Sequence, residues 1–148
     1  MIHEIARFYS THIVCFDSDK MAGQDHVEEA IRHAQRSFSG TKPISNSIEM
    51  EALLFAAGSR QCNAATLFGI HTGKNTLFVC ICPVKEGIWE DLAQHMLFVS
   101  EKKDVLTQEQ EKRLMKLYDI TQNELELVGI NRLKDLILER IALLEVNR

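Results

Sequence analysis

Residues 48–82 constrain the fold more than any other part of the chain, because a helix, a tight cap, a second short helix and a strand follow one another there. Residues 48–57 are apolar almost all the way round, with charge only at Glu49 and Glu51, which predicts a helix in the middle of the core. Residues 76–82 form a nearly continuous apolar run, which is typical of a strand covered on both faces. The segment therefore predicts an α/β fold.

The break between the two helices of this segment carries one arginine, Arg60. Gly58 can take the left-handed conformation that ends a helix, and Ser59 can accept hydrogen bonds from the first free N–H groups of the next helix. Arg60 would then lie near a helix N-terminus, where an arginine fork and unpaired amides can bind a phosphate, a carboxylate or a nucleotide. The alternative is an arginine that only braces the loop against Glu49 or Glu51.

Length and composition predict a single domain spanning residues 1–148, with 45% hydrophobic and 26% charged residues. The formal charge of −4 argues against a protein that coats nucleic acid through bulk electrostatics. No apolar run approaches the roughly 20 residues needed to cross a bilayer, and the N-terminus lacks the apolar core of a signal peptide. We therefore expect a cytoplasmic protein with no membrane partner.

Hydrophobic periodicity predicts most of the remaining elements. We expect a fold of the α/β (α+β) class, in which a small mixed sheet packs with several helices and the chain ends in a long amphipathic helix. Strands are expected at residues 5–9, 12–16 and 97–99, and helices at residues 25–38, 61–68 and 88–96. Two capping boxes, Thr107 with Gln110 and Thr121 with Glu124, mark two further helix starts.

The expected last helix, residues 131–144, carries a broad apolar face. Leu133, Ile137 and Ile141 lie on this face at 3.6 residues per turn, whereas Leu138 points away from it. Such a helix can pack on its own domain and still offer apolar surface to a partner helix, so these four residues are candidates for a partner interface. Pure core packing is the alternative.

Familiar catalytic and metal-binding motifs do not fit this chain. Residues 69–76 look like a phosphate-binding loop but are one residue short, have Asn75 after the lysine, and lead into a strand. No histidine forms an i, i+4 pair with another histidine, and the cysteines lack paired metal-ligand spacing. We therefore expect no metal, no cofactor and no catalytic residues. The four cysteines read as reduced core thiols: Cys15, Cys62, Cys80 and Cys82.

Basic residues gather near the informative segment, with Arg60, His71 and Lys74 in its loops and Arg36 upstream. If folding brings them together, they form a patch able to hold a few phosphates, suited to an RNA end or loop rather than to a long duplex. Scattered solvated charges are the alternative.

The order of these segments resembles one known family. The segments are HVEEAIRHAQ, then EALLFAAGSRQ, an FGI ending, a GKN turn into an apolar strand, and a closing RLKDLILERIALLEV helix. Together they resemble the small kinase-binding subunit of the KEOPS (EKC) complex, the PRPK-binding protein family, over nearly the whole chain. The most specific part is residues 58–61 with Ala64 and residues 68–70. Cys62 departs from the aliphatic residue expected there, but a thiol packs as a small apolar group.

This resemblance implies an α/β protein without catalysis of its own. It implies binding to the N-lobe of the small atypical kinase of the KEOPS complex, and through it to the rest of that complex. It further implies support for threonylcarbamoylation of the adenosine beside the anticodon in tRNA, with tRNA held by its 3′ CCA end. We assign tRNA contact to Arg60 and Lys74 by their chemistry, with His71 and Arg36 beside them, and kinase contact to the last helix.

Two rival functions remain open from the residues alone. One is an enzyme or binding protein for a small anionic ligand anchored by Arg60, which a closed pocket with a perturbed carboxylate beside Arg60 would favour. The other is a structural oligomerisation module.

Overall fold

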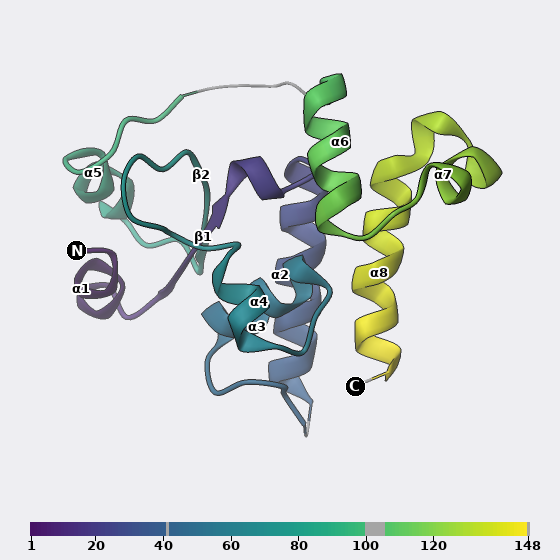
Figure 1. Cartoon of the computed structure of the whole chain (residues 1–148). Coiled ribbons are helices and arrows are strands. Elements are labelled where there is room, and N and C mark those ends of the chain that lie inside the picture. The colour runs from purple at the N-terminus through teal and green to yellow at the C-terminus, as the bar shows by residue number, and fades with distance from the viewer. Residues whose placement is uncertain (41, 100–105, 148) are drawn as a thin grey trace.

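The computed structural model describes residues 1–40, 42–99 and 106–147, which form eight α-helices and one small sheet (Figure 1). The fold class is therefore confirmed as α+β. In chain order the elements are α1 (Ile2–Phe8), β1 (His12–Asp17), the 3-10 helix η1 (Ser18–Lys20), α2 (Gln24–Ser39), α3 (Ile48–Ala57), α4 (Cys62–Thr66), β2 (Leu77–Cys82), α5 (Ile88–Ala93), α6 (Gln108–Leu117), α7 (Gln122–Val128), the 3-10 helix η2 (Ile130–Arg132) and α8 (Leu133–Asn147).

The sheet consists of two antiparallel strands, β1 and β2, and is smaller than the mixed sheet expected. Its register runs from His12 opposite Cys82 to Asp17 opposite Leu77. The strand expected at residues 5–9 is wrong, because this segment lies mostly within α1. Residues 97–99 do not form the expected strand either and are largely exposed.

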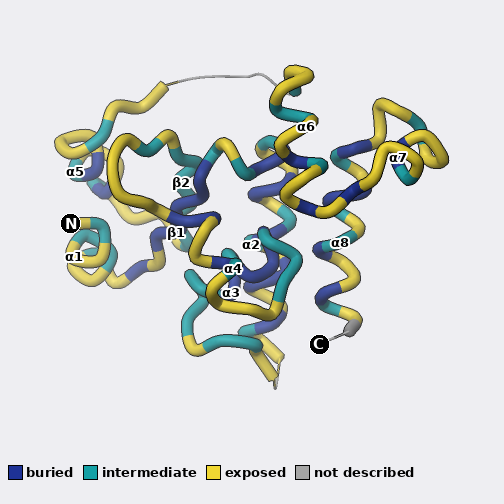
Figure 2. The backbone as a smooth tube through the Cα atoms, viewed as in Figure 1, coloured by how far each residue is buried: buried dark blue, intermediate teal, exposed yellow. Residues whose placement is uncertain are grey.

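A large core lies between α2, α3, α8 and one face of β1 (Figure 2). Helix α2 contributes the small side chains of Ala30 and Ala34, which have no exposed surface and let α3 and α8 approach closely. Helix α3 contributes Phe55, and β1 contributes Phe16, both fully buried. The prediction that residues 48–57 form a central buried helix is confirmed.

A second, smaller core lies on the other side of β1, under α1 and α5. Ile13 and Cys15 face this core, whereas Val14 and Phe16 face the large one, as the two-residue period of a strand requires. Strand β1 is thus the element covered on both faces. In β2 only Ile81 is buried, so the expectation of full cover for residues 76–82 is wrong.

Helix ends follow local chemistry at several of the expected positions. Ser47 accepts a hydrogen bond from the N–H of Met50 at the start of α3, and Gly58 ends this helix in the left-handed conformation at φ 63° and ψ 32°. The capping box at the start of α6 is present in full, since Thr107 and Gln110 bond each other reciprocally. These caps fix the turns that carry Arg60 and join α6 to the core.

Candidate functional site

Arg60 lies in the exposed break between α3 and α4, as predicted. The hydroxyl of Ser59 accepts a hydrogen bond from the N–H of Gln61 at 3.0 Å, so it caps this turn rather than the helix that follows. Within the described part of the chain, no hydrogen bond or ion pair holds the Arg60 side chain. The guanidinium is therefore available to an outside anion. Helix α4 is only five residues long, however, so its dipole adds little to such a site.

The bracing of Arg60 by Glu49 or Glu51 does not occur. Glu49 pairs with Nδ1 of His12 at 2.5 Å. Glu51 has no exposed surface and accepts four hydrogen bonds, from the Ser37 hydroxyl, the N–H of Ile44 at 2.9 Å, and the N–H and hydroxyl of Ser45, each at 2.7 Å. Burial alone would raise the pKa of the Glu51 carboxyl, but these hydrogen bonds outweigh it and lower the pKa. Glu51 is a structural anchor, which the sequence pattern did not reveal.

His71 and Lys74 lie in an exposed turn that Asn75 closes. The side chain of Asn75 accepts from the N–H of His71 at 2.9 Å and donates to the His71 carbonyl at 2.8 Å. Nε2 of His71 lies 3.7 Å from Oδ2 of Asp17, so this ring already faces a carboxylate. Lys74 makes no ion pair with any residue that the structure describes. The turn leads into β2, which agrees with the rejection of a phosphate-binding loop.

Arg36 lies on α2 and is engaged within the fold. Its Nη2 atom lies 3.4 Å from Oε2 of Glu145 and 3.1 Å from Nδ1 of His33. The four candidate RNA contacts therefore come from three separate segments, and among the described residues no hydrogen bond or ion pair joins one of these four side chains to another. Within the parts of the chain that the structure describes, the charges of Arg60 and Lys74 have no partner, whereas His71 faces Asp17 and Arg36 faces Glu145. Their role in RNA binding remains a prediction.

The four candidate interface residues of α8 lie mainly inside the protein. Leu133, Ile137 and Ile141 are at most 3% exposed and pack in the large core. Leu138 is half-buried and packs against the same core. A partner could reach the first three only if the fold opened. The core-packing alternative thus describes these positions, and the partner surface predicted for them stays untested.

An exposed apolar strip runs from the end of α7 along the outer side of α8. Leu127 and Ile130 are 87% and 64% exposed, and on α8 Leu143 and Val146 are 45% and 78% exposed. A pocket of about 350 Å³, lined by Leu127, Leu136 and charged residues of α8, lies within this strip. Glu139, Leu143 and Val146 share one helix face at i, i+4 and i+7. We call the surface formed by Leu127, Ile130, Leu143 and Val146 the α7–α8 strip.

The histidines and cysteines form close pairs in places, but the described structure does not bring them together as a metal site. Among the described residues, no group of three or more histidine, cysteine or acidic side chains is placed to hold a metal ion. The sulfur atoms of Cys80 and Cys82 lie 3.5 Å apart, and burial, followed by the neighbouring thiol, raises the pKa of Cys80 to about 12. Cys15 is buried as expected, whereas Cys62 is exposed and does not pack in the core.

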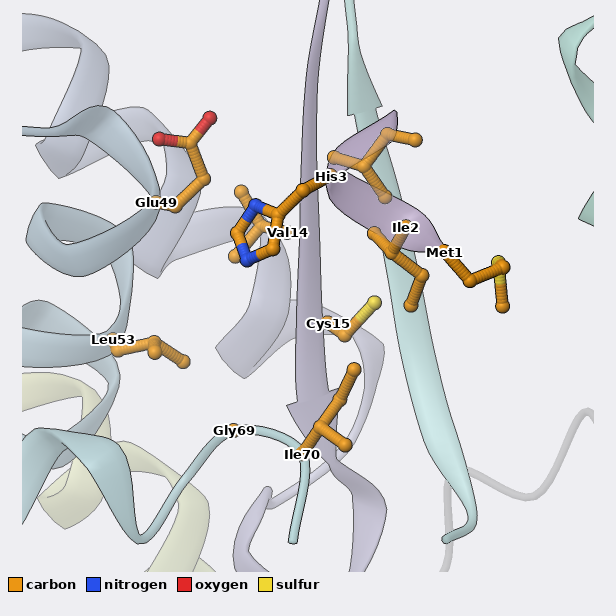
Figure 3. A pocket seen from close by; sticks show the side chains of 10 residues that line it. Met1, Ile2, His3, Val14, Cys15, Glu49, Leu53, Gly69 and Ile70 are labelled. Atoms are coloured by element: carbon orange, nitrogen blue, oxygen red, sulfur yellow. The ribbon is translucent and has the colours of Figure 1, made fainter. Parts of the chain in front are cut away.

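A groove that sequence analysis missed runs beside β1 (Figure 3). It has a volume of about 450 Å³ and is mainly apolar. One wall is α1, with Ile2 and His3, and the other is α3, with Glu49 and Leu53. Gly69 and Ile70 border it where the chain leaves α4. No sequence signal could have revealed the groove, because its walls come from four separated segments.

Residues 4–145 match the family described as kinase binding protein CGI-121. The chain belongs to this family. The match confirms the family resemblance identified from the order of the sequence segments, and it covers the described fold except for the first two residues of α1 and the last two of α8. None of the curated proteins matches the chain. None of the helices in the described part of the chain combines the length and apolar character of a membrane span.

Proposed function

We propose that this CGI-121 family member is the non-catalytic kinase-binding subunit of a KEOPS complex and works in the cytoplasm. The observation that carries this proposal is the match to a kinase-binding family over residues 4–145. In that role the protein binds the small atypical kinase directly and the other subunits through it. It supports threonylcarbamoylation of the adenosine next to the anticodon of tRNA.

The α7–α8 strip is the surface best suited to a kinase partner. Its exposed side chains Leu127, Ile130, Leu143 and Val146 are apolar, and the adjoining pocket offers a socket for a partner side chain. Protein interfaces combine an apolar centre with a polar rim, and Arg132, Asp135 and Glu139 supply the rim here. The surface is rigid, because the opposite side of α8 is anchored in the large core.

A pull-down with the purified kinase tests the proposal. Leu127→Arg and Leu143→Arg place charges within the strip, and each should weaken kinase binding at least about tenfold. Leu97→Arg is the matched control, because Leu97 is 88% exposed but lies outside the strip. If the wild-type protein fails to bind the kinase, the function itself is wrong. If the wild type binds the kinase and both strip variants bind it equally well, the α7–α8 strip is not the kinase-binding surface.

For tRNA, Arg60 and Lys74 are the best-supported contacts, because both are exposed and keep unpaired charges in the described structure. The double variant Arg60→Glu, Lys74→Glu should weaken binding of tRNA, and affinity of the wild type should fall as salt rises. Lys85→Glu, an exposed lysine after β2, is a control for charge alone. A tRNA lacking its 3′ CCA should bind the wild type as weakly as the complete tRNA binds the double variant.

The rival reading of an anion-binding enzyme at Arg60 gains no support from the described pockets. Neither of them is lined by Arg60. The carboxylate with a lowered pKa in the preceding helix, Glu51, is fully buried and bonded on both oxygens. Turnover of a small anionic substrate by the purified subunit, abolished by Arg60→Ala, would favour this rival.

A further inference from the structure

The two edges of β1 differ in what they bond. In an antiparallel pair, residues alternate between those that bond the partner strand and those whose backbone groups point away from it. The N–H of Ser18 bonds the carbonyl of Thr76 at 2.9 Å, in line with the register that pairs His12 with Cys82. The backbone N–H and carbonyl groups of the even-numbered residues of β1 therefore point toward β2. Those of Ile13, Cys15 and Asp17 point toward the opposite edge.

This opposite edge is closed at both ends and open between them. The N–H of Thr11 bonds the carbonyl of Ala6 at 3.0 Å, and the N–H of Asp17 bonds the carbonyl of Phe68 at 2.7 Å. Between these points, no described residue bonds the N–H or the carbonyl of Ile13 or Cys15. A Cβ added at Gly69 would lie 4.0 Å from the Cys15 carbonyl oxygen, which places this oxygen on the side of the groove in Figure 3.

The open groups lie in a recess rather than on a flat surface. Ile13 and Cys15 are 6% and 8% exposed, and buried backbone groups are nearly always hydrogen-bonded. The walls formed by α1 and α3 rise on both sides of the strand (Figure 3). A free strand edge is a template for pairing with another strand, which would lie about 4.8 Å away. The groove supplies space along this edge and apolar side chains for a strand to contact.

We propose that the open edge of β1 binds an extended segment of a partner protein by strand addition. A segment of about five residues exchanges hydrogen bonds with Ile13 and Cys15, and its alternate side chains point toward α3 and α1. An apolar side chain packs against Leu53 and Ile70. A basic side chain pairs with Glu49, whose Oε1 bonds His12 while Oε2 has no bond within the described structure.

The recess selects a single extended segment over a second copy of this chain. In a second copy the same edge lies between its own α1 and α3, so two recessed edges cannot approach to strand spacing. The proposal goes beyond kinase and tRNA binding, and it depends on neither the α7–α8 strip nor Arg60.

Amide hydrogen exchange of the free full-length chain is the first test. Val14 and Phe16 donate their N–H groups to β2, whereas Ile13 and Cys15 donate to no described residue. The amides of Ile13 and Cys15 should therefore exchange at least about tenfold faster than their two neighbours in the same strand. Equal protection of all four amides in a monomer would overturn the proposal, and so would protection that grows with concentration as dimers form.

Selection from a random heptapeptide library on the immobilised chain is the second test. We expect binders with alternating apolar residues and one lysine or arginine. A synthetic copy of the best binder should slow the exchange of the Ile13 and Cys15 amides at least about tenfold. Selection of no binder, or binding without slower exchange at these two amides, would overturn the proposal.

Two variants separate groove binding from other modes. Gly69→Leu places a side chain between Leu53 and the Cys15 carbonyl and should reduce peptide affinity at least about tenfold. Thr72→Leu, an exposed residue outside the groove lining, is its matched control. Glu49→Lys should weaken binding of the peptide that carries the basic residue. The same variant should bind a second peptide in which glutamate replaces that basic residue. If the folded Glu49→Lys variant does not come to prefer the glutamate peptide over the basic one, the assignment of the groove is wrong.

Discussion

The hydroxyl of Tyr118 lies 3.2 Å from Nε2 of His26, and both groups contact the carbonyl oxygen of Ala56. Nδ1 of His26 accepts a hydrogen bond from the N–H of Ala22 at 2.9 Å, so the ring proton belongs on Nε2, which donates to Ala56 at 2.9 Å. The Tyr118 hydroxyl donates to the same carbonyl at 2.7 Å. This network ties α2 and the end of α6 to the last turn of α3.

Protonation of His26 would break this network, which predicts a loss of stability in mild acid. Burial is the main cause that lowers the pKa of His26 to about 4; the hydrogen bond to the Ala56 carbonyl opposes it, and the nearby charge of Lys134 adds to it. In the unfolded chain the pKa returns to about 6.5, so the unfolded state takes up the proton first. The free energy of unfolding should therefore fall by about 3 kcal/mol between pH 6.5 and pH 4, as measured by urea denaturation.

A matched pair of variants isolates this effect. His26→Gln should be less stable at neutral pH but should lose most of the slope between pH 6.5 and pH 4. His95→Gln changes an exposed histidine and should keep the wild-type slope. An unchanged slope in His26→Gln would assign the acid sensitivity to other groups.

The carboxylate of Glu51 should be essential for stability, because it has no exposed surface and four hydrogen bonds hold it inside the fold. Its four donors, from Ser37, Ile44 and Ser45, fix the segment that precedes α3. Glu51→Gln replaces an acceptor oxygen by an NH₂ group that meets these donors, and should cost about 3 kcal/mol of the free energy of unfolding. Glu49→Gln changes a partly exposed carboxylate two residues earlier in the same helix and should cost far less of the free energy of unfolding.

Glu51 and His26 affect the free energy of unfolding in different pH ranges. Its pKa is lowered in the folded state, so its contribution is present above about pH 4.5 and is lost as the pH falls through the folded pKa. Urea denaturation below pH 4 should therefore show a further decrease in the wild type that Glu51→Gln lacks. A parallel decrease in both proteins would contradict this role.

Local signals predicted the elements whose residues pack as their periodicity suggests. The bounds of α3 and the left-handed Gly58 follow from an apolar run that ends at a glycine, and both are confirmed. The wrong prediction of a strand at residues 5–9 rests on one β-branched residue, Ile5, and two aromatic residues, Phe8 and Tyr9. In the structure Ile2, Ile5 and Tyr9 face the smaller core at i, i+3 and i+7, which is helical spacing.

Tertiary contacts decided the features that the sequence could not predict. Thr121 accepts from the N–H of Glu124, but the expected return bond is absent because Glu124 pairs with Arg140 of α8 at 3.3 Å. Arg140 itself lies inside the apolar face predicted for the last helix, where it bonds the Tyr118 carbonyl. The groove beside β1 likewise depends on the relative placement of α1 and α3, which no local pattern contains.

Gly58, which ends α3 just before Arg60, should tolerate substitution poorly because its backbone is in the left-handed conformation. At φ 63° an alanine costs about 1 kcal/mol or slightly more, although its Cβ would meet Arg140 at an ordinary 3.6 Å. Gly58→Ala should lower the melting temperature by about 3 °C, and Gly58→Asn by less, because asparagine tolerates this conformation better. A larger loss with asparagine than with alanine would point to crowding instead.

Leu138 and Leu143 should separate fold stability from kinase binding on the same helix. Leu138 packs against the large core, so Leu138→Arg should lower the melting temperature and weaken kinase binding only through loss of folded protein. Leu143 is 45% exposed within the α7–α8 strip, so Leu143→Arg should leave the melting temperature within about 2 °C and weaken binding directly. Titration of the kinase with the folded fraction of each variant distinguishes the two cases. If the folded Leu138→Arg protein loses binding while Leu143→Arg retains it, the interface lies on the Leu138 side of α8.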